Sequence, residues 1–427
     1  MSTTEYQVAI NRSRIEKRIT ELGQIGRIGD TGVCRLALSQ EYRQGVELVK
    51  AWMEEAGMVS RIDHFGNVIG RLEGKNPHAP ILMLGSHIDS QPYGGRFDGV
   101  VGVLGAIEAV QTMKENGIVP EVPIEVAAFC DEEGCRFNNG FFGSRGILGR
   151  LEPGELDRTD KNGITRRQAL IEFGGDPAKF AESEYAAENI GAYLELHIEQ
   201  GPVLESLDRP VGIVTGIAGL LWLTVEMTGT AGHAGSVPMP LRKDALVGAA
   251  KVIAALNDIV KPSPDSKAVG TVGNIQVFPD SRNIIPEKVK FTIDLRDIDQ
   301  GKRDENEKRL REKIEAIAQE HGLTYSITED NNSEPRYCAE WIKSIINEEG
   351  ERMGLDCPEL MSGPAHDALI MSYVTDYAMI FVRCKEGISH NPKEFSSIED
   401  ISLGTELLYR TAVRIATEAF TKRGDLR

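Results

Sequence analysis

Cysteine is scarce in this sequence, and its six cysteines are scattered. They lie at Cys34, Cys130, Cys135, Cys338, Cys357 and Cys384, and no two of them form a CxxC pair. This spacing favours neither a disulfide scaffold nor a zinc site built from thiolates. We therefore expect reduced and buried thiols.

Positive charge and long apolar runs are also lacking. The 427 residues carry a formal net charge of -17, which argues against nucleic acid or an anionic membrane as a partner. Residues 1–20 hold no apolar stretch of signal-peptide length, and no later segment approaches the roughly 20 apolar residues of a membrane span. We expect a cytoplasmic protein, and if its substrate is an anion, the positive charge that binds it must be local.

The strand and helix signals predict an α/β protein, and the chain is too long for one ordinary hydrophobic core. Strand and helix signals alternate in the first half, with a hairpin over 59–74, buried strands over 79–90 and 123–133, and a helix over 98–117. In that helix Gly99, Gly102 and Gly105 are three residues apart, which is not the GxGxxG spacing. We interpret them as a smooth stripe that packs against a sheet.

A second domain is predicted inside the first. From about residue 212 the signals follow the order strand, helix, strand, strand, helix, strand, over 220–229, 242–260, 269–278, 289–298, 303–322 and 324–330. This order is typical of a ferredoxin-like α+β fold. A helix over 339–353, a strand over 377–384 and a final helix then resume the α/β pattern. The predicted domains are residues 1–212 and 331–427 for the main domain and 213–330 for the insertion.

Three of the eight histidines lie at the ends of apolar strands. They are His87, His197 and His390. In α/β folds ligands bind at this edge of the sheet. Each histidine alone is more often structural, and Asp98 alone is as often a helix cap as a functional residue. Together with Asp98 and Glu133, however, they form the thiolate-free ligand set expected for zinc or a related divalent ion.

Seven motifs in order resemble those of a known family. They are GSHIDSQPYGGRFDG, DEEGCRF, ELHIEQG, GHAGSVPM, NIIPEKVKFTIDLR, SGPAHDA and GISHNP. The chain thereby resembles the N-carbamoyl-L-amino-acid hydrolases, allantoate amidohydrolases and β-ureidopropionases, from about residue 30 to 405. The resemblance implies a catalytic domain like that of zinc aminopeptidases, with an inserted ferredoxin-like domain that serves as lid and dimerisation domain.

By this resemblance two divalent ions would be bound per subunit. His87, Asp98 and His197 would hold one ion, and Asp98, Glu133 and His390 the other, with Asp98 bridging. Three protein ligands per ion leave positions for water and substrate. Related peptidases commonly use a carboxylate where this chain has His197, which agrees with the carbamoylase branch. Zinc, manganese, cobalt and nickel all suit such sites, so the metal stays open.

The resemblance leaves Glu132 free of metal. It would act as the base that takes a proton from water and passes it to the leaving amine, although taken alone Glu132 could also be a solvated surface carboxylate. Asp89 would orient the imidazole of His87 from behind. Asp131 has no predicted role, and we expect it to tolerate replacement by Asn.

Substrate recognition is assigned to other motifs. By the resemblance, Arg296 would bind the substrate carboxylate, with Asn283 beside it. His233 would stabilise the charge that develops on the attacked carbonyl. Without the motif Arg296 would be interpreted as a surface cation, yet arginine pairs well with carboxylates. The further predicted pocket residues are Gln200, Gly363 and His366. A homodimer is also implied, in which the inserted domain reaches a partner's site or closes over the substrate.

The leading prediction is hydrolysis of the ureido C–N bond of N-carbamoyl-L-amino acids. Allantoate amidohydrolase is the alternative, followed by β-ureidopropionase and, more distantly, a peptidase or N-acyl amino acid hydrolase. A catalytically inactive metal-binding scaffold is the alternative from another class, disfavoured because every ligand and the base are present. Serine hydrolase chemistry is disfavoured because the sequence has no GxSxG motif.

Overall fold

The computed structural model describes residues 9–261 and 266–419 of the chain. Contacts divide the chain into two compact units. The main unit runs to Thr215 and also contains Cys338–Leu360 and the chain from Ala365 onward, whereas the inserted unit comprises Gly216–Tyr337 and Met361–Pro364. The boundaries between the units therefore fall at 215/216 and 337/338, where the sequence suggested 212/213 and 330/331.

The main unit is built on a mixed β-sheet. In order across the sheet its strands are β8 (Val211–Ile217), β18 (Tyr377–Val382), β7 (Ile190–Ile198), β5 (Ile81–His87), β6 (Ile124–Phe129), β4 (Val68–Leu72) and β3 (Val59–Ile62). The end of β8 enters the inserted unit and pairs with β16 (Arg336–Tyr337), and β17 (Glu359–Ser362) also pairs with β8. The hairpin predicted over 59–74 is β3 and β4.

The four central strands of this sheet are parallel and fully buried. β18 runs parallel to β7, and β5 runs parallel to both β7 and β6. Every residue of these strands is buried, which is why their sequences are nearly continuous apolar runs rather than alternating ones. Because they are parallel, their carboxyl ends meet at one edge, and side chains that follow them are brought together there.

Helices cover this sheet. They are α1 (Arg12–Leu22), α2 (Gln40–Glu55), α3 (Val100–Glu115), α4 (Phe142–Ile147), α5 (Arg166–Phe173), α6 (Phe180–Ser183), α7 (Val203–Ser206), α10 (Glu340–Arg352), α11 (Asp367–Met371) and α12 (Ile398–Arg414). Two short strands, β1 (Arg27–Ile28) and β2 (Gly32–Val33), form a separate hairpin. Ser39 and Ser397 cap α2 and α12 by accepting backbone N–H groups, as their position before each helix favours.

The glycine stripe of α3 allows a close approach to the sheet. A Cβ atom added at Gly102 would lie 2.2 Å from the carbonyl oxygen of Leu196, and one at Gly105 would lie 2.8 Å from Leu196 Cδ2. Both distances are far below van der Waals contact. The interpretation of the stripe as a packing feature is therefore confirmed.

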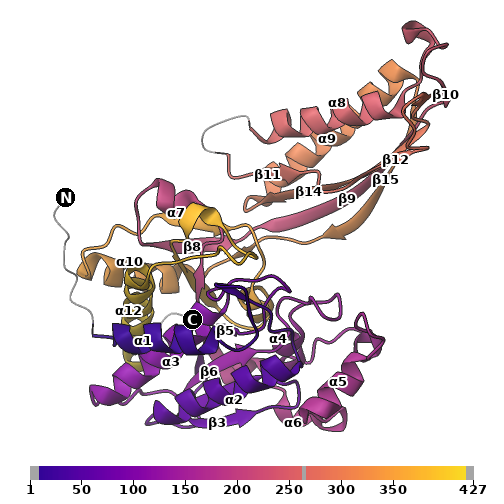
Figure 1. Ribbon diagram of the computed structural model, residues 1–427. Coiled ribbons are helices and arrows are strands. Elements are labelled where there is room, and N and C mark those ends of the chain that lie inside the picture. The colour runs from indigo at the N-terminus through magenta and orange to yellow at the C-terminus, as the bar shows by residue number, and fades with distance from the viewer. Residues whose placement is uncertain (1–8, 262–265, 420–427) are drawn as a thin grey trace. The chain divides into compact units, whose positions relative to one another are not determined.

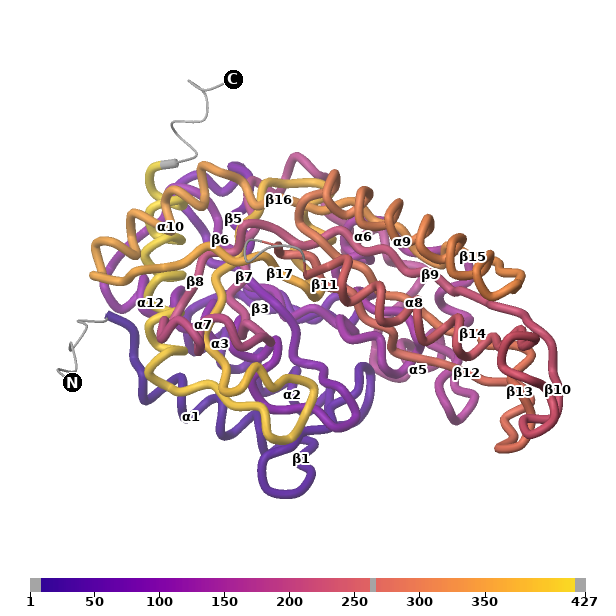
Figure 2. Tube along the Cα trace, turned by 90° about the horizontal axis from the view of Figure 1, so that it is seen from above, coloured from indigo at the N-terminus to yellow at the C-terminus, as the bar shows by residue number. Residues whose placement is uncertain are grey.

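The inserted unit is an antiparallel sheet with two helices on one face (Figures 1 and 2). Across the sheet its strands are β11 (Val269–Thr271), β14 (Lys288–Asp297), β9 (Gly219–Thr228) and β15 (Thr324–Asn332), and β12 (Ile275–Phe278) also pairs with β14. α8 (Ala245–Val260) and α9 (Gln300–His321) pack side by side against it. The ferredoxin-like order of elements predicted from the sequence is confirmed.

The core of the inserted unit follows the two periodicities of the sequence. Along β9 the side chains of Leu221, Leu223, Val225 and Met227 are buried, whereas the residues between them are more exposed. On α9 the buried positions include Leu310, Ile314 and Ile317, three or four residues apart. Gly322 ends α9 in the left-handed region with φ 63°, a conformation that glycine adopts without strain.

One predicted strand of the inserted unit is wrong in detail. Residues 269–278 form two short strands, β11 and β12, instead of one. Gly273 and Asn274 lie between them, and both residue types are unfavourable in strand interiors. A small two-stranded antiparallel sheet of β10 (Gly232–His233) and β13 (Ile284–Ile285) was not predicted as strands at all.

No helix within residues 9–261 and 266–419 combines the length and the apolar character that crossing a bilayer requires.

Candidate active site

The predicted ligands gather where the central strands end. His87 is the last residue of β5 and His197 lies near the end of β7, while Glu132 and Glu133 follow β6. His390 follows β18. Asp98 lies two residues before the start of α3, with Gly99 between them. Segments that are far apart in the sequence thus contribute to one site because their strands are parallel neighbours.

The inner group consists of His87, Asp98 and His197. Asp98 Oδ1 lies 3.5 Å from His87 Nε2 and 3.2 Å from His197 Nε2. The Nδ1 atoms of the two rings face the carbonyl oxygens of Asp89 and Ile198 at 3.0 and 2.9 Å. In the neutral ring this contact places the hydrogen on Nδ1, which leaves the Nε2 lone pair directed at the group.

The outer group consists of Asp98, Glu133 and His390. His390 Nε2 lies 3.2 Å from Asp98 Oδ2 and 3.6 Å from Glu133 Oε2. The hydrogen bond with Asp98 raises the pKa of His390 to about 9. Asp98 therefore turns one oxygen to each group, which is the arrangement that the bridging prediction requires.

The donor set fits a divalent ion in both groups. Two ligands bonded at about 2.1 Å to a tetrahedral ion lie roughly 3.4 Å apart. The imidazole-to-carboxylate distances of 3.5, 3.2, 3.2 and 3.6 Å in the two groups are close to that value. The ligand atoms of each group all lie within 4.8 Å of one another. Imidazole and carboxylate donors without thiolate suit zinc and other first-row divalent metals.

Gly99 presses against the inner group. It has φ 65°, and a Cβ atom at this position would lie 2.4 Å from His87 Nε2. Its backbone N–H donates to His197 Nε2 at 3.2 Å. A side chain at this position is therefore excluded both by the backbone conformation and by the imidazole beside it.

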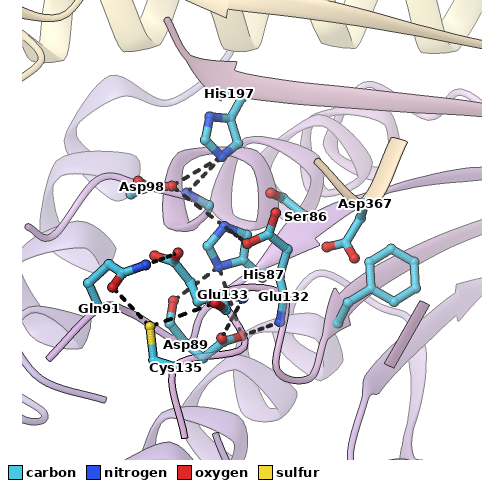
Figure 3. A network of polar contacts seen from close by, with 12 residues as sticks. Ser86, His87, Asp89, Gln91, Asp98, Glu132, Glu133, Cys135, His197 and Asp367 are labelled. Carbon is cyan, nitrogen blue, oxygen red and sulfur yellow. Dashed lines mark hydrogen bonds and ion pairs between the residues drawn. The ribbon is translucent and has the colours of Figure 1, made fainter. Parts of the chain in front are cut away.

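Asp89 holds the turn that carries the two glutamates (Figure 3). Its carboxylate accepts the backbone N–H groups of Glu132 and Glu133 at 3.3 and 3.2 Å. Its own carbonyl oxygen contacts His87 Nδ1, whereas its carboxylate oxygen is 3.9 Å from that nitrogen. Asp89 thus contacts the His87 ring through its backbone carbonyl, while its carboxylate supports the turn of the two glutamates.

Glu132 lies beside the inner group without belonging to either group of candidate ligands. Its Oε2 is 3.6 Å from His87 Nε2, and its side chain is 9% exposed (Figure 3). Burial raises the pKa of Glu132 well above its usual range, opposed by His87 and reinforced by Glu133 and Asp367. A raised pKa makes this carboxyl group a stronger proton acceptor than an ordinary glutamate.

Behind His197 lies a buried acidic pair that sequence reasoning missed. Glu195 accepts hydrogen bonds from Ser86 Oγ at 2.8 Å and from the backbone N–H of Ala368 at 2.9 Å. Asp367 accepts one from Ser144 Oγ at 2.6 Å. Glu195 shares a strand face with His197 two residues away, which was the available signal. Because its oxygens are engaged, Glu195 acts as a structural acceptor.

Glu394 was also missed. It is buried, and its Oε1 accepts the backbone N–H groups of Phe97 and Asp98 at 2.9 and 3.0 Å. Ser389 Oγ contacts both Glu394 Oε2, at 3.0 Å, and Asp98 Oδ2, at 2.8 Å. Glu394 therefore links the loop of Asp98 to the loop of His390. Nothing in the sequence distinguished it from a surface carboxylate.

The expectation for Asp131 is at odds with the structure. Asp131 is buried with φ 58° and pairs with Arg166 Nη2 at 2.9 Å. Burial raises the pKa of Asp131 to about 7, with Arg166 acting in the opposite direction. Arg166 also pairs with Glu155. Asp131 thus anchors a buried ion-pair network, and replacement by Asn would remove a charged partner from it.

Two predicted pocket residues of the main unit lie against the ligand groups. Gln200 has φ 56°, and its Nε2 donates to Asp98 Oδ2 at 2.7 Å. His366 is buried with its ring centroid 4.3 Å from that of His197. Burial lowers the pKa of His366 well below its usual range, so the ring is neutral at neutral pH.

Arg296 and Gly363 lie together in the inserted unit. Arg296 Nη1 donates to the carbonyl oxygen of Gly363 at 2.8 Å. Its Nε and Nη2 form a bidentate pair with Asp294 at 2.8 and 2.7 Å. Three of the five N–H bonds of the guanidinium are engaged, which leaves two for a further acceptor.

His233 and Asn283 lie at the other end of the inserted unit. The Asn283 backbone carbonyl accepts the N–H of Ala234 at 2.9 Å beside the β10–β13 pair. Figure 1 shows β10 at the end of the sheet opposite β11, which pairs with Arg296. The eight residue steps from Lys288 to Arg296 along extended β14 span about 26 Å. Asn283 is therefore not beside Arg296 in one subunit.

Comparisons with known proteins agree with this geometry. The family model described as peptidase family M20/M25/M40 matches residues 83–414. An N-carbamoyl-L-amino-acid amidohydrolase of Pseudomonas sp. (strain NS671) is 47% identical over 409 residues, covering 95% of this chain and 99% of that protein. An allantoate deiminase of Arabidopsis thaliana is 36% identical, covering 92% of this chain and 80% of that protein. The crystal structure of an amidase of the hydantoinase/carbamoylase family from Burkholderia multivorans matches with a TM-score of 0.89 at 36% identity. The match covers 96% of this chain and 98% of that chain.

Proposed function

This chain belongs to peptidase family M20/M25/M40, among its C–N amidohydrolases, and we propose that it hydrolyses the ureido C–N bond of N-carbamoyl-L-amino acids. One water is consumed, and the products are the free amino acid, carbon dioxide and ammonia. The observation that carries the proposal is the pair of His/carboxylate groups that share Asp98, with the unliganded Glu132 beside them. We place the enzyme in the cytoplasm.

The choice of substrate rests on the degree of relatedness. Identity to the N-carbamoyl-L-amino-acid amidohydrolase is 47%, against 36% to the allantoate deiminase. Allantoate, which also carries ureido groups and a carboxylate, is the second candidate. N-carbamoyl-β-alanine is the third. An inactive metal-binding scaffold is less supported because every predicted ligand and Glu132 are assembled.

In this proposal His87, Asp98 and His197 would hold one divalent ion, and Asp98, Glu133 and His390 would hold a second. When bound, such ions would supply Lewis-acid activation of the ureido carbonyl and of water. Glu132 Oε2 accepts the proton of the attacking water and returns it to the leaving nitrogen. Burial supports this role because it raises the carboxyl pKa and so favours proton uptake by Glu132.

Recognition of the substrate carboxylate is assigned to Arg296. The guanidinium is already fixed by Asp294 and Gly363, so its two remaining N–H bonds can meet both oxygens of a carboxylate at little entropic cost. Gln200 and His366 are the proposed pocket residues of the main unit. His366, being neutral, can donate or accept a hydrogen bond without adding charge.

We propose a homodimer in which His233 and Asn283 serve a partner's active site. An amino acid derivative is much shorter than the roughly 26 Å of strand between them and Arg296. One small substrate therefore cannot contact both ends of the inserted unit of one subunit. His233, which would stabilise charge on the attacked carbonyl, must then act on a second substrate molecule in the partner.

The test is ammonia release by metal-reconstituted protein with N-carbamoyl-L- and D-amino acids, N-carbamoyl-β-alanine and allantoate. We expect the N-carbamoyl-L-amino acids to have the highest kcat/KM and chelation to abolish activity. Glu132→Gln should lose roughly 10²–10⁴-fold in kcat while retaining its metal. Near-normal turnover of that variant would remove Glu132 as the base. A higher kcat/KM for allantoate would replace the substrate assignment.

Two further variants test recognition. Arg296→Ala should raise KM for carboxylate substrates far more than it lowers kcat, since the interaction serves binding. His233→Ala mixed with Arg296→Ala should regain activity if the two residues act in different subunits, because a mixed dimer contains one site with both residues intact. Absence of such complementation would argue against the shared site.

A further inference from the structure

The side chain of Gln91 lies between a candidate ligand and a cysteine (Figure 3). Gln91 Nε2 donates a hydrogen bond to Glu133 Oε2 at 2.6 Å. Cys135 Sγ donates to Gln91 Oε1 at 2.9 Å. Both ends of the amide are therefore engaged: the ionised carboxylate, which only accepts, selects the NH₂ end, and the thiol supports this direction by donating to the amide oxygen.

Separate hydrogen bonds hold the main chain and the side chain of Glu133. Its backbone N–H donates to Asp89 Oδ2 at 3.2 Å, which fixes the main chain of the turn. The Glu133 side chain still has three rotatable bonds that Asp89 does not restrict. Gln91 contacts the same oxygen, Oε2, that faces His390 Nε2 at 3.6 Å. The amide therefore restricts the carboxylate rotamer that closes the outer group.

The outer group needs this restriction more than the inner group does. The side chains of His87 and His197 are each 1% exposed, whereas that of His390 is 47% exposed. Tight packing already fixes the ligands of the inner group. In the outer group His390 is open to solvent, while the Glu133 side chain is 7% exposed, and the hydrogen bond from Gln91 adds to burial in fixing the Glu133 carboxylate. Residues that orient ligands from behind typically contribute 10–100-fold to metal affinity.

We propose that Gln91 is a positioning residue for the outer metal position, where it orients the Glu133 carboxylate while Cys135 supports the direction of the Gln91 amide. The proposal rests on the ligand assignment of the proposed function and extends it to two residues outside the ligand set. Gln91 touches neither substrate nor reacting atoms and acts through Glu133 alone.

The test is calorimetric titration of metal-stripped, full-length protein with Zn²⁺ alone. We expect two binding events in the wild type, and the event that His390→Ala removes identifies the outer position. Gln91→Met keeps the length of the side chain but removes both hydrogen bonds. It should weaken the outer event by about 10–100-fold and leave the inner event within about threefold.

Cys135 is tested by a pair of variants. Cys135→Ser retains a donor and should keep the outer affinity within about threefold of wild type, whereas Cys135→Ala should weaken it by roughly tenfold. Gln319→Met is the matched control, because Gln319 Nε2 donates to Glu315 Oε1 at 3.3 Å on the exposed face of α9. It should change neither event.

The possible failures are distinguishable. Equal weakening of both events in Gln91→Met, or no weakening of the outer event, would overturn the role of Gln91 while leaving the two metal positions intact. A wild type that binds fewer than two Zn²⁺ ions would overturn the ligand assignment and the role of Gln91 with it. Thermal melting of each metal-free variant shows whether an effect reflects the site or the fold.

Discussion

The inner and outer ligand groups share Asp98 but are built in different ways. The inner histidines lie at the ends of buried parallel strands, and their side chains are 1% exposed. The outer ligands Glu133 and His390 lie on turns beyond the strands, and His390 is 47% exposed with φ 53°. Both groups are supported by hydrogen bonds, but the inner histidines are also enclosed by packing, whereas His390 is not. We expect the inner position to bind a divalent ion more tightly.

The largest expected effect comes from removing what the two groups share. Asp98→Asn keeps the size of the side chain but removes the charge that faces three imidazoles. Metal binding at both positions should be lost. Activity should fall by more than the hundredfold that is typical when a residue hydrogen-bonded to a metal ligand is removed. Elemental analysis of the dialysed protein gives the metal content. One fully occupied position in this variant would show that the groups are independent.

Removing one histidine from each group separates them. His390→Ala should lose the outer ion and retain the inner one, because the inner ligands are fixed by burial. His197→Ala should lose the inner ion and also weaken the outer one, since Asp98 loses the 3.2 Å contact that orients it. Calorimetric titration of both variants measures this asymmetry. If each variant lost only the ion of its own group, the proposed asymmetry between the inner and outer groups would be contradicted.

A single methyl group should disturb the inner group alone. Gly99→Ala places a Cβ atom 2.4 Å from His87 Nε2 at a residue with φ 65°. Zn²⁺ affinity at the inner position should fall by roughly 10–100-fold, the range for residues that orient ligands. Gly117→Ala is the control, because Gly117 also has a positive φ, of 67°, but an added Cβ meets nothing within 4 Å. Similar titration curves for the two variants would rule out the steric explanation.

The exposed histidine of the outer group should make metal-free stability depend on pH. The His390 pKa is about 9 in the folded chain, through its hydrogen bond with Asp98, and about 6.5 when unfolded. Because the folded pKa is raised, this stabilisation is fully present below pH 6.5 and is lost as the pH rises through 9. Thermal melting at pH 6.5 and 9 should show a smaller decrease in His390→Ala than in wild type. An identical decrease in melting temperature in the two proteins would show that His390 does not cause the pH dependence of stability.

The smallest effect on the metal groups is expected from Asp131→Asn. The amide suits the left-handed backbone but weakens the buried contact with Arg166. We expect a loss of about 1.5–3 kcal/mol in the free energy of unfolding, the usual contribution of a hydrogen bond to a charged group. Both Zn²⁺ affinities should be unchanged. Chemical denaturation and titration measure the two quantities, and a change in metal affinity would connect the ion-pair network to the site.

The elements and the candidate ligands were predictable because their signals are local, whereas the division of the ligands into two groups came from the family resemblance. The apolar runs before His87 and His197 and the 3.6-residue pattern of Leu310, Ile314 and Ile317 needed no knowledge of the rest of the chain. The ferredoxin-like order of the insertion followed from such signals. The break at Gly273 and Asn274 was missed although its residues were visible.

The residues that support the site were not predictable because their partners are distant in sequence. Glu394 contacts the backbone of Asp98 across 296 residues, and Asp131 contacts Arg166 across 35. Gln91 resembles any polar loop residue until Glu133 is brought beside it by strand pairing. The separation of Asn283 from Arg296 likewise depends on the extended course of β14. Burial of a charge becomes visible only when the fold is known.

The position of the insertion also sets an order of events during synthesis. All inner ligands precede residue 216, whereas His390 follows the inserted unit, which has a core of its own. Domains generally fold as units while the chain emerges from its amino terminus. The ribosome therefore releases a complete set of inner ligands first, then a whole domain, and only afterwards the residue that completes the outer set. The two metal positions differ in the time at which they can exist.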